Sequence, residues 1–173
     1  MSNTEIEIRR LSPVEAAVYR TLRLEALRTA PAAYSSTYAF EHDQPLSWFA
    51  DRLTQSTVFG ALIGDDLVGI AAFVAKQGEK EKHKGLLVGM YVRPSARRRG
   101  IGRLLAAAVI DHARSRVEIL LLSVIAGNDA ARRLYASLGF AAYGVEKNAL
   151  KQNGRYWDDV LMALPLTLHE AAA

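Results

Sequence analysis

The segment that most constrains the fold of this chain is residues 86–114, LLVGMYVRPSARRRGIGRLLAAAVIDHAR. An apolar, β-prone run meets a proline, a turn with two glycines follows, and apolar residues then recur at helical spacing from about Gly100. A strand, a tight turn and a helix in this order place unpaired N–H groups at a helix N-terminus. An anion is favoured there by hydrogen bonds and by the helix dipole.

The three arginines at 97–99 leave several interpretations open on spacing alone: a solvated charged turn, a nucleic-acid-binding arm or a phosphate-binding turn. The net charge of +4 is too small to indicate nucleic acid by itself, and no aromatic-basic stripe accompanies the arginines. A P-loop is excluded because Gly102 is followed by Arg103-Leu104, and the dinucleotide fingerprint is excluded because Leu105 stands where its third glycine belongs.

The rest of the chain reads as alternating strands and helices. Strands are predicted at residues 5–9, 58–63, 67–74, 86–92, 119–126, 140–145 and 156–164, and helices from 13 to about 30, from 45 to about 53, from about 100, and at 130–138. Residues 31–44 are predicted to be a loop. This order predicts a mixed α/β fold, one sheet with helices on both faces, in a single domain spanning 1–173.

Local signals refine these elements. Ser12, Pro13 and Glu15 are typical of a capped helix start. Helical spacing predicts one apolar face from Val14, Val18, Leu22 and Ala26, and another from Ile101, Leu104, Leu105, Ala108, Val109 and His112. Gly89 inside an apolar strand predicts a bulge or a close approach to the backbone.

Composition excludes several chemistries. With no cysteine, the chain has no disulfide, no thiolate metal site and no cysteine-linked acyl intermediate. Its longest strongly apolar run, ILLLSVIA, is far shorter than the roughly 18 residues of a membrane helix, and its first ten residues lack the apolar core of a signal peptide. We therefore expect a cytoplasmic protein with no metal, membrane or nucleic-acid partner.

Two ordered motifs resemble those of the GNAT superfamily of N-acetyltransferases. Val92-x-Pro94-x-x-Arg97-x-x-Gly100-Ile101-Gly102 is similar to the family's acetyl-CoA pyrophosphate motif, [Q/R]-x-x-G-x-[G/A]. Asn128-x-x-Ala131-x-x-x-Tyr135-x-x-x-Gly139-Phe140 resembles its second signature. The resemblance covers most of the chain. It implies a mostly antiparallel sheet of about seven strands, splayed by a bulge, with acetyl-CoA as co-substrate.

The resemblance also implies roles for individual residues. The backbone of Met90, Tyr91 and Val92 would pair with the pantetheine arm, and the amides of the 97–103 turn would cradle the pyrophosphate, with cofactor-binding positions at Arg97, Arg98, Arg99, Gly100, Ile101, Gly102 and Arg103. Asn128 would hydrogen-bond the arm, and Tyr135 would act as the general acid for the departing thiolate. Without the resemblance, Asn128 reads as a helix N-cap and Tyr135 as an aromatic at the edge of the core.

The acceptor side is less constrained. Some family members carry a glutamate on the strand before the pyrophosphate turn, but residues 86–92 hold no acid. The base must then come from elsewhere, and candidates are Glu25, Glu41, His42, Asp158 and Asp159, of which we expect Glu41. Acceptor-side positions are predicted at Glu25, Tyr38, Glu41 and Asp158.

The expected reaction is direct transfer of an acetyl group, in a ternary complex, to a primary amine. A small-molecule acceptor is the first expectation and a protein amine the second. The alternative is a catalytically silent module that binds acyl-CoA as a sensor or regulator. A homodimer is compatible with the base rate for soluble homo-oligomers, although no residue pattern indicates one.

Overall fold

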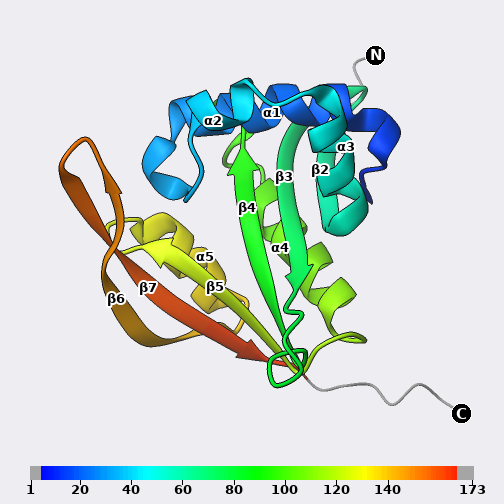
Figure 1. Ribbon diagram of the computed structural model, residues 1–173. Helices are drawn as coiled ribbons and strands as arrows, with labels where there is room; N and C mark the ends of the chain where they lie inside the picture. Colours follow the sequence, from blue (N-terminus) through cyan, green and yellow to red (C-terminus); the bar gives the residue numbers. More distant parts are fainter. Residues whose placement is uncertain (1–4, 167–173) are drawn as a thin grey trace, which may run out of the picture.

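The computed structural model describes residues 5–166; residues 1–4 and 167–173, which the expected domain 1–173 includes, lie outside the described part. Its seven strands form one sheet in the order β1-β2-β3-β4-β5-β7-β6 (Figure 1). They are β1 (Ile6–Arg10), β2 (Thr57–Ile63), β3 (Asp66–Ala75), β4 (Lys84–Val92), β5 (Ile119–Ile125), β6 (Ala141–Gln152) and β7 (Arg155–Pro165). Of the paired strands described, β4 and β5 are parallel and the others are antiparallel. The predicted mixed, mostly antiparallel sheet is confirmed.

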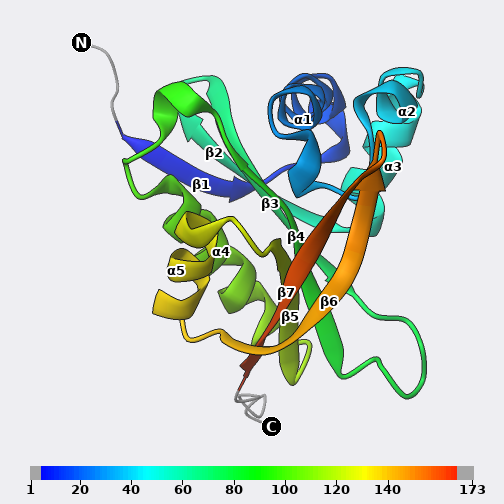
Figure 2. The same cartoon turned by 90° about the vertical axis from the view of Figure 1, so that its left-hand side faces the viewer.

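The sheet is covered on both faces, as predicted. The helices are α1 (Ala16–Thr29), α2 (Tyr38–His42), α3 (Leu46–Gln55), α4 (Ile101–Ala113) and α5 (Asp129–Ser137). Figure 2 shows α4 and α5 on one side of the sheet and α1 and α3 on the other. Each side has its own apolar core, centred on Leu105 and Val109 beneath α4 and on Leu22 and Phe49 beneath α1 and α3. Within residues 5–166, no helix has the length and apolar character needed to cross a bilayer.

The central feature of the sheet is the divergence of β4 from β5. The two strands pair at Lys84↔Ile119, Gly85↔Leu120 and Leu86↔Leu121, and then separate (Figure 1). Gly89 has a φ of +66°, and the register between β3 and β4 shifts in the same region. A left-handed residue bends the strand and increases its local twist, and glycine adopts that conformation without a Cβ clash. The bulge predicted at Gly89 is therefore confirmed, and it opens the sheet.

The predicted helical faces were partly wrong. Val14 is 92% exposed, Val18 is 51% exposed and Leu104 is 43% exposed. Val14 belongs to a separate 3₁₀ turn, Pro13–Glu15, that precedes α1. Val18 lies within α1 but at the edge of its buried face, which includes Tyr19, Leu22 and Ala26. The Ser12 backbone N–H does donate to the Glu15 carboxylate at 2.8 Å, as the capping signal predicted.

The loop predicted at 31–44 contains the short helix α2. Thr37 caps it, because its Oγ1 accepts a hydrogen bond from the Phe40 N–H at 3.2 Å. The helix is only five residues long, too short for a periodic apolar pattern to mark it in the sequence.

Candidate active site

The turn before α4 presents a row of backbone amides. Gly100 is in the left-handed conformation, with a φ of +76°, and α4 begins at the next residue. The N–H groups of Ile101, Gly102 and Arg103 belong to the first turn of the helix, where no carbonyl lies one turn earlier to accept from them. A Cβ built on Gly100 would meet nothing within 4 Å, so the space outside the turn is open. This geometry suits a phosphate-bearing ligand.

Two arginine side chains of this turn hold it in place. Arg97 Nε donates to the Val92 carbonyl at 3.0 Å, and Arg103 Nη1 donates to Ser137 Oγ at 2.8 Å. These contacts fasten the turn to β4 and α5. Arg98 is exposed and has a φ of +61°, an uncommon conformation for a residue with a side chain. The turn therefore offers its backbone to a ligand, while its side chains brace it or add positive charge.

A narrow pocket of about 130 Å³ lies where β4 and β5 have separated. Its walls come from β4, β5 and α5, and they include Gly89, Met90, Ser123, Asn128 and Tyr135. The sequence motifs are thus brought together from three separate elements. A slot between two strands that no longer pair can accept an extended chain whose polar groups take the place of a missing strand.

Asn128 and Tyr135 have the structural roles that the sequence predicted without the resemblance, and both also line the narrow pocket. Asn128 Oδ1 accepts from the Ala131 N–H at 3.2 Å, which makes it the N-cap of α5, while the residue also lines the narrow pocket. Tyr135 is 5% exposed and packs edge-on against Phe140 at a centroid distance of 5.8 Å. Burial raises the pKa of the Tyr135 phenol to about 12, so it keeps its proton at neutral pH.

A wide pocket of about 500 Å³ adjoins the narrow one. Tyr34, Gly89, Ser123 and Ile125 line both pockets, so the two meet at the opening between the strands. Tyr34 donates a hydrogen bond to the Met90 carbonyl at 2.9 Å, and burial raises the pKa of its phenol. The arrangement can therefore hold an elongated ligand and bring a second molecule against one end of it.

Sequence reasoning did not single out two residues at this junction. Tyr34 lies in the segment 31–44, predicted to be a loop, and could not be placed because its position depends on the path from α1 to α2. Ser123 carried a weak signal, since it is the one polar residue within the strand ILLLSVI. A hydroxyl in such a strand often only satisfies a local hydrogen bond.

Glu41 does not fit the role of base. It is 0% exposed, and its carboxylate accepts from Arg23 Nε at 2.9 Å and from Arg23 Nη2 at 2.7 Å. Desolvation would raise the pKa of Glu41, but the hydrogen bonds and charge of Arg23, with help from Ser36 and Arg52, hold it below the ordinary 4.5. Glu41 lines neither pocket. It anchors α2 to α1 through an ion pair.

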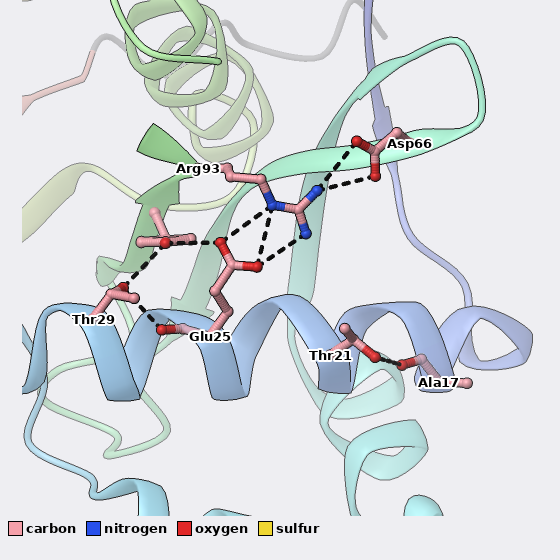
Figure 3. Close-up of polar contacts among 7 residues, drawn as sticks. Ala17, Thr21, Glu25, Thr29, Asp66 and Arg93 are labelled. Atoms are coloured by element: carbon pink, nitrogen blue, oxygen red, sulfur yellow. Dashed lines mark hydrogen bonds and ion pairs between the residues drawn. The ribbon is translucent and has the colours of Figure 1, made fainter. Parts of the chain in front are cut away.

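Glu25 belongs to a second polar network, between α1 and the strands β3 and β4 (Figure 3). Its carboxylate accepts from Arg93 at 3.1 Å and from the Tyr91 hydroxyl at 3.0 Å, and Arg93 also bonds Asp66. Burial works to raise the pKa of Glu25, yet the bonds from Arg93 and Tyr91 lower it overall. This network fixes the Tyr91 side chain on the side of β4 that faces α1, so Tyr91 can offer a ligand only its backbone.

The other acceptor-side candidates also lie away from the cavities. Tyr38 stacks on His42 at 5.2 Å, and Asp158 accepts from Lys147 at 2.8 Å and from the Asn148 N–H at 2.9 Å. Neither these two residues nor Glu25 lines either pocket. Asp159, the neighbour of Asp158, does line the wide pocket. Among residues 5–166, no group of three or more His, Cys, Asp or Glu residues is arranged to hold a metal ion.

Comparisons with known proteins agree with this geometry. Residues 20–140 match the acetyltransferase (GNAT) family. A [ribosomal protein bS18]-alanine N-acetyltransferase from Salmonella typhimurium is 39% identical over 142 residues, which cover 73% of this chain and 93% of that protein. An L-methionine sulfoximine/L-methionine sulfone acetyltransferase from Pseudomonas aeruginosa is 27% identical over 145 residues, 78% of this chain and 83% of that one. The structure of yncA from Salmonella typhimurium, solved with its cofactor acetyl-CoA, has a TM-score of 0.80 at 23% identity and covers 98% of both chains.

Proposed function

This chain belongs to the GNAT family and is an acetyl-CoA-dependent acetyltransferase, and from that premise we propose that it moves the acetyl group directly to a primary amine in a ternary complex. The observation that carries the proposal is the meeting of the narrow and wide pockets at Gly89 and Ser123. Two substrates bound in adjoining pockets can react without an enzyme-bound intermediate. The chain also has no cysteine to form an acetyl-thioester of its own.

The described residues fit acetyl-CoA. The N-terminal amides of α4 would take the pyrophosphate, and the narrow pocket would take the pantetheine arm along the backbone of residues 90–92. Because Asn128 uses its side-chain oxygen to cap α5, its NH₂ group is left to donate to a carbonyl of the arm. A backbone N–H of β4 near the bulge would stabilise the oxyanion of the tetrahedral intermediate.

Tyr135 would assist departure of the thiolate. The neutral amine nitrogen attacks the thioester carbonyl carbon and then loses a proton to water, the C–S bond breaks, and CoA leaves as a thiolate that must gain a proton. With its pKa raised to about 12, the Tyr135 phenol is a weaker acid than a thiol of pKa about 8.5, so it stays protonated through the attack and hydrogen-bonds the sulfur as negative charge develops there. Transfer of its proton to the thiolate is uphill and is completed when the proton released by the amine returns to the phenol.

The size of the wide pocket favours a small-molecule amine. About 500 Å³ lies within the range of pockets that enclose small ligands, roughly 300–1,000 Å³. The similarity to the Pseudomonas aeruginosa sulfoximine acetyltransferase supports this choice. A protein N-terminus is the second candidate, favoured by the 39% identity to the ribosomal-protein-alanine acetyltransferase.

The direct test is release of the CoA thiol from acetyl-CoA with a thiol reagent, across a panel of small primary amines and of peptides with free N-termini. We expect acceptor-dependent release with members of the small-amine set, and mass spectrometry should find one added acetyl group on the acceptor nitrogen. Acetyl-CoA binding by calorimetry with no release for any amine would favour the catalytically silent alternative. Release with the peptides alone would replace the small-molecule acceptor by a protein amine.

A further inference from the structure

Asp159 on β7 is a buried acid with no ion-pair partner within residues 5–166. The residue is 9% exposed, and its Oδ1 is enclosed without a hydrogen-bond partner among the described residues. The other buried acid, Glu41, is held by Arg23 through two hydrogen bonds. An unpaired carboxylate in a protein interior is costly, and such a group is usually retained because something outside the chain satisfies it.

The strand register places Asp159 at the reaction junction. Its Cα pairs with that of Ile125 on β5, and Ile125 lines both pockets. Asp159 and Leu161 line the wide pocket, whereas Val160 and Met162 belong to the core cluster that includes α4. This alternation is that of a strand with one face on the core and the other on the cavity. The carboxylate is therefore on the cavity face, beside the opening to the narrow pocket.

The basic side chains of the wide pocket already have acidic partners. Arg23 pairs with Glu41 at 2.7 Å, Arg52 approaches the same carboxylate at 3.8 Å, and Lys76 pairs with Glu81 at 2.7 Å. None of them is paired with Asp159. The negative charge on this wall is thus left for a ligand.

We propose that Asp159 is the residue that binds the ammonium group of the acceptor amine. The acceptor then enters as a cation, and its nitrogen is held on the cavity face of β7 next to the thioester end of the narrow pocket. The ammonium must pass one proton to water before the neutral nitrogen can attack the thioester. This inference rests on the proposed function for the identity of the ligand as an acceptor, but the binding of an ammonium group can be measured without catalysis. It places an acidic residue in the acceptor pocket, where β4 has no acid and Glu41 does not reach.

The test compares Asp159→Asn with Asp158→Asn, the adjacent acid that pairs with Lys147 outside both pockets. In Asp159→Asn, we expect the KM for each accepted amine to rise roughly 10- to 100-fold, the usual range for losing a hydrogen bond to a charged group. The KM for acetyl-CoA should stay within about twofold, because the cofactor contacts proposed above lie on other elements. The Asp158→Asn protein should keep both constants.

Two further measurements separate this inference from the proposed function. Titration of ethylammonium chloride, with sodium chloride as control, should shift the Asp159 carboxyl carbon signal in NMR but not that of Asp158. The Tm of Asp159→Asn without ligand should rise, because a neutral amide replaces an unpaired buried charge. An unshifted Asp159 signal, or an unchanged KM for the amines in Asp159→Asn, would overturn the inference while acetyl transfer stood. A shifted signal in a protein that acetylates no amine would sink the proposed function and leave the ammonium site.

Discussion

The two pockets are built from different materials. The cofactor side relies mainly on the backbone of one continuous segment, residues 89–103, which holds the α4 amides, the left-handed Gly100 and the bulge of β4. Asn128 and Tyr135 add side chains to it. The acceptor side uses side chains that arrive from distant parts of the chain, such as Tyr34, Ser123 and Asp159. A site made from a local backbone leaves a motif in the sequence, whereas a site assembled from scattered side chains leaves none. With this division, substitutions on the acceptor side can alter which amine is accepted while the cofactor side continues to bind the same co-substrate.

The wide pocket includes Arg23, whose buried ion pair with Glu41 joins α1 to α2. We expect the largest effect of any substitution from breaking this pair. Replacing Glu41 with Gln leaves the Arg23 guanidinium buried without a counter-charge, and we expect a loss of about 3–5 kcal/mol in the free energy of unfolding measured with urea. The matched control is Glu81→Gln, which breaks an exposed pair with Lys76 and should leave stability nearly unchanged. An equally stable Glu41→Gln protein would show that the pair does not hold α2 to α1.

The same pair predicts how stability changes in acid. The folded-state pKa of Glu41 lies below the ordinary 4.5, so its contribution is complete above that value and is lost as pH falls through the lower, folded pKa. We therefore expect the wild-type protein to lose stability steeply below pH 4.5, and Glu41→Gln to show a shallower loss over the same interval.

The next test concerns the cofactor side. We expect Tyr135→Phe to lower kcat by about 10²-fold or more, since a positioned proton donor is lost, while the KM for acetyl-CoA stays within a few-fold. The ring keeps its contact with Phe140, and no hydrogen bond to the Tyr135 hydroxyl is known from the described residues, so the Tm should not fall. Tyr156→Phe, which is 50% exposed and lies outside both pockets, is the control. Unchanged turnover in Tyr135→Phe would remove that residue from the proposed role.

The smallest expected effect is the difference in acetyl-CoA affinity between alanine substitutions at two nearby glycines, Gly100 and Gly102. Gly100→Ala puts a Cβ on a left-handed residue in the amide row, which costs about 1–2 kcal/mol in backbone strain and should weaken acetyl-CoA binding roughly tenfold by calorimetry. Gly102→Ala lies inside α4, where the new Cβ would meet Leu134 at an ordinary 3.4 Å. It should leave binding intact and stabilise the helix by up to about 1 kcal/mol. Equal affinities in the two variants would mean that the amide row does not hold the ligand.

Sequence patterns predicted the elements better than the faces they present. The order of the strands and of the longer helices and the bulge at Gly89 depend on local signals, namely apolar runs, turn residues and one glycine inside a strand, and they were confirmed. The short helix α2, in the segment predicted to be a loop, was missed. Val14 was misassigned because it lies in the 3₁₀ turn before α1. Val18 was misassigned because a spacing of four residues drifts around a helix of about 3.6 residues per turn, away from the buried Tyr19, Leu22 and Ala26.

The acceptor side could not be predicted for a related reason. Glu41 and Asp159 are both acids near apolar residues in the sequence, and only the tertiary structure shows that Arg23 neutralises one and nothing in the described chain neutralises the other. A glutamate and an arginine 18 positions apart give no sign that they will meet. The charge state of a cavity is decided by such pairings, which is why the four acceptor-side candidates chosen from the sequence do not line the pockets.

The opening between β4 and β5 has a consequence for the stability of the folded protein. Beyond Leu86 and Leu121, these two strands no longer pair with each other, so a ligand in the gap can take the place of a missing partner strand. A ligand that binds only the folded chain stabilises it by RT ln(1 + [L]/Kd), about 2.7 kcal/mol at a hundredfold excess over Kd. Acetyl-CoA bound between the two strands would then fill the gap in the sheet and raise the free energy of unfolding. Because proteases cleave the unfolded chain, the protein should resist digestion longer with acetyl-CoA bound than without it.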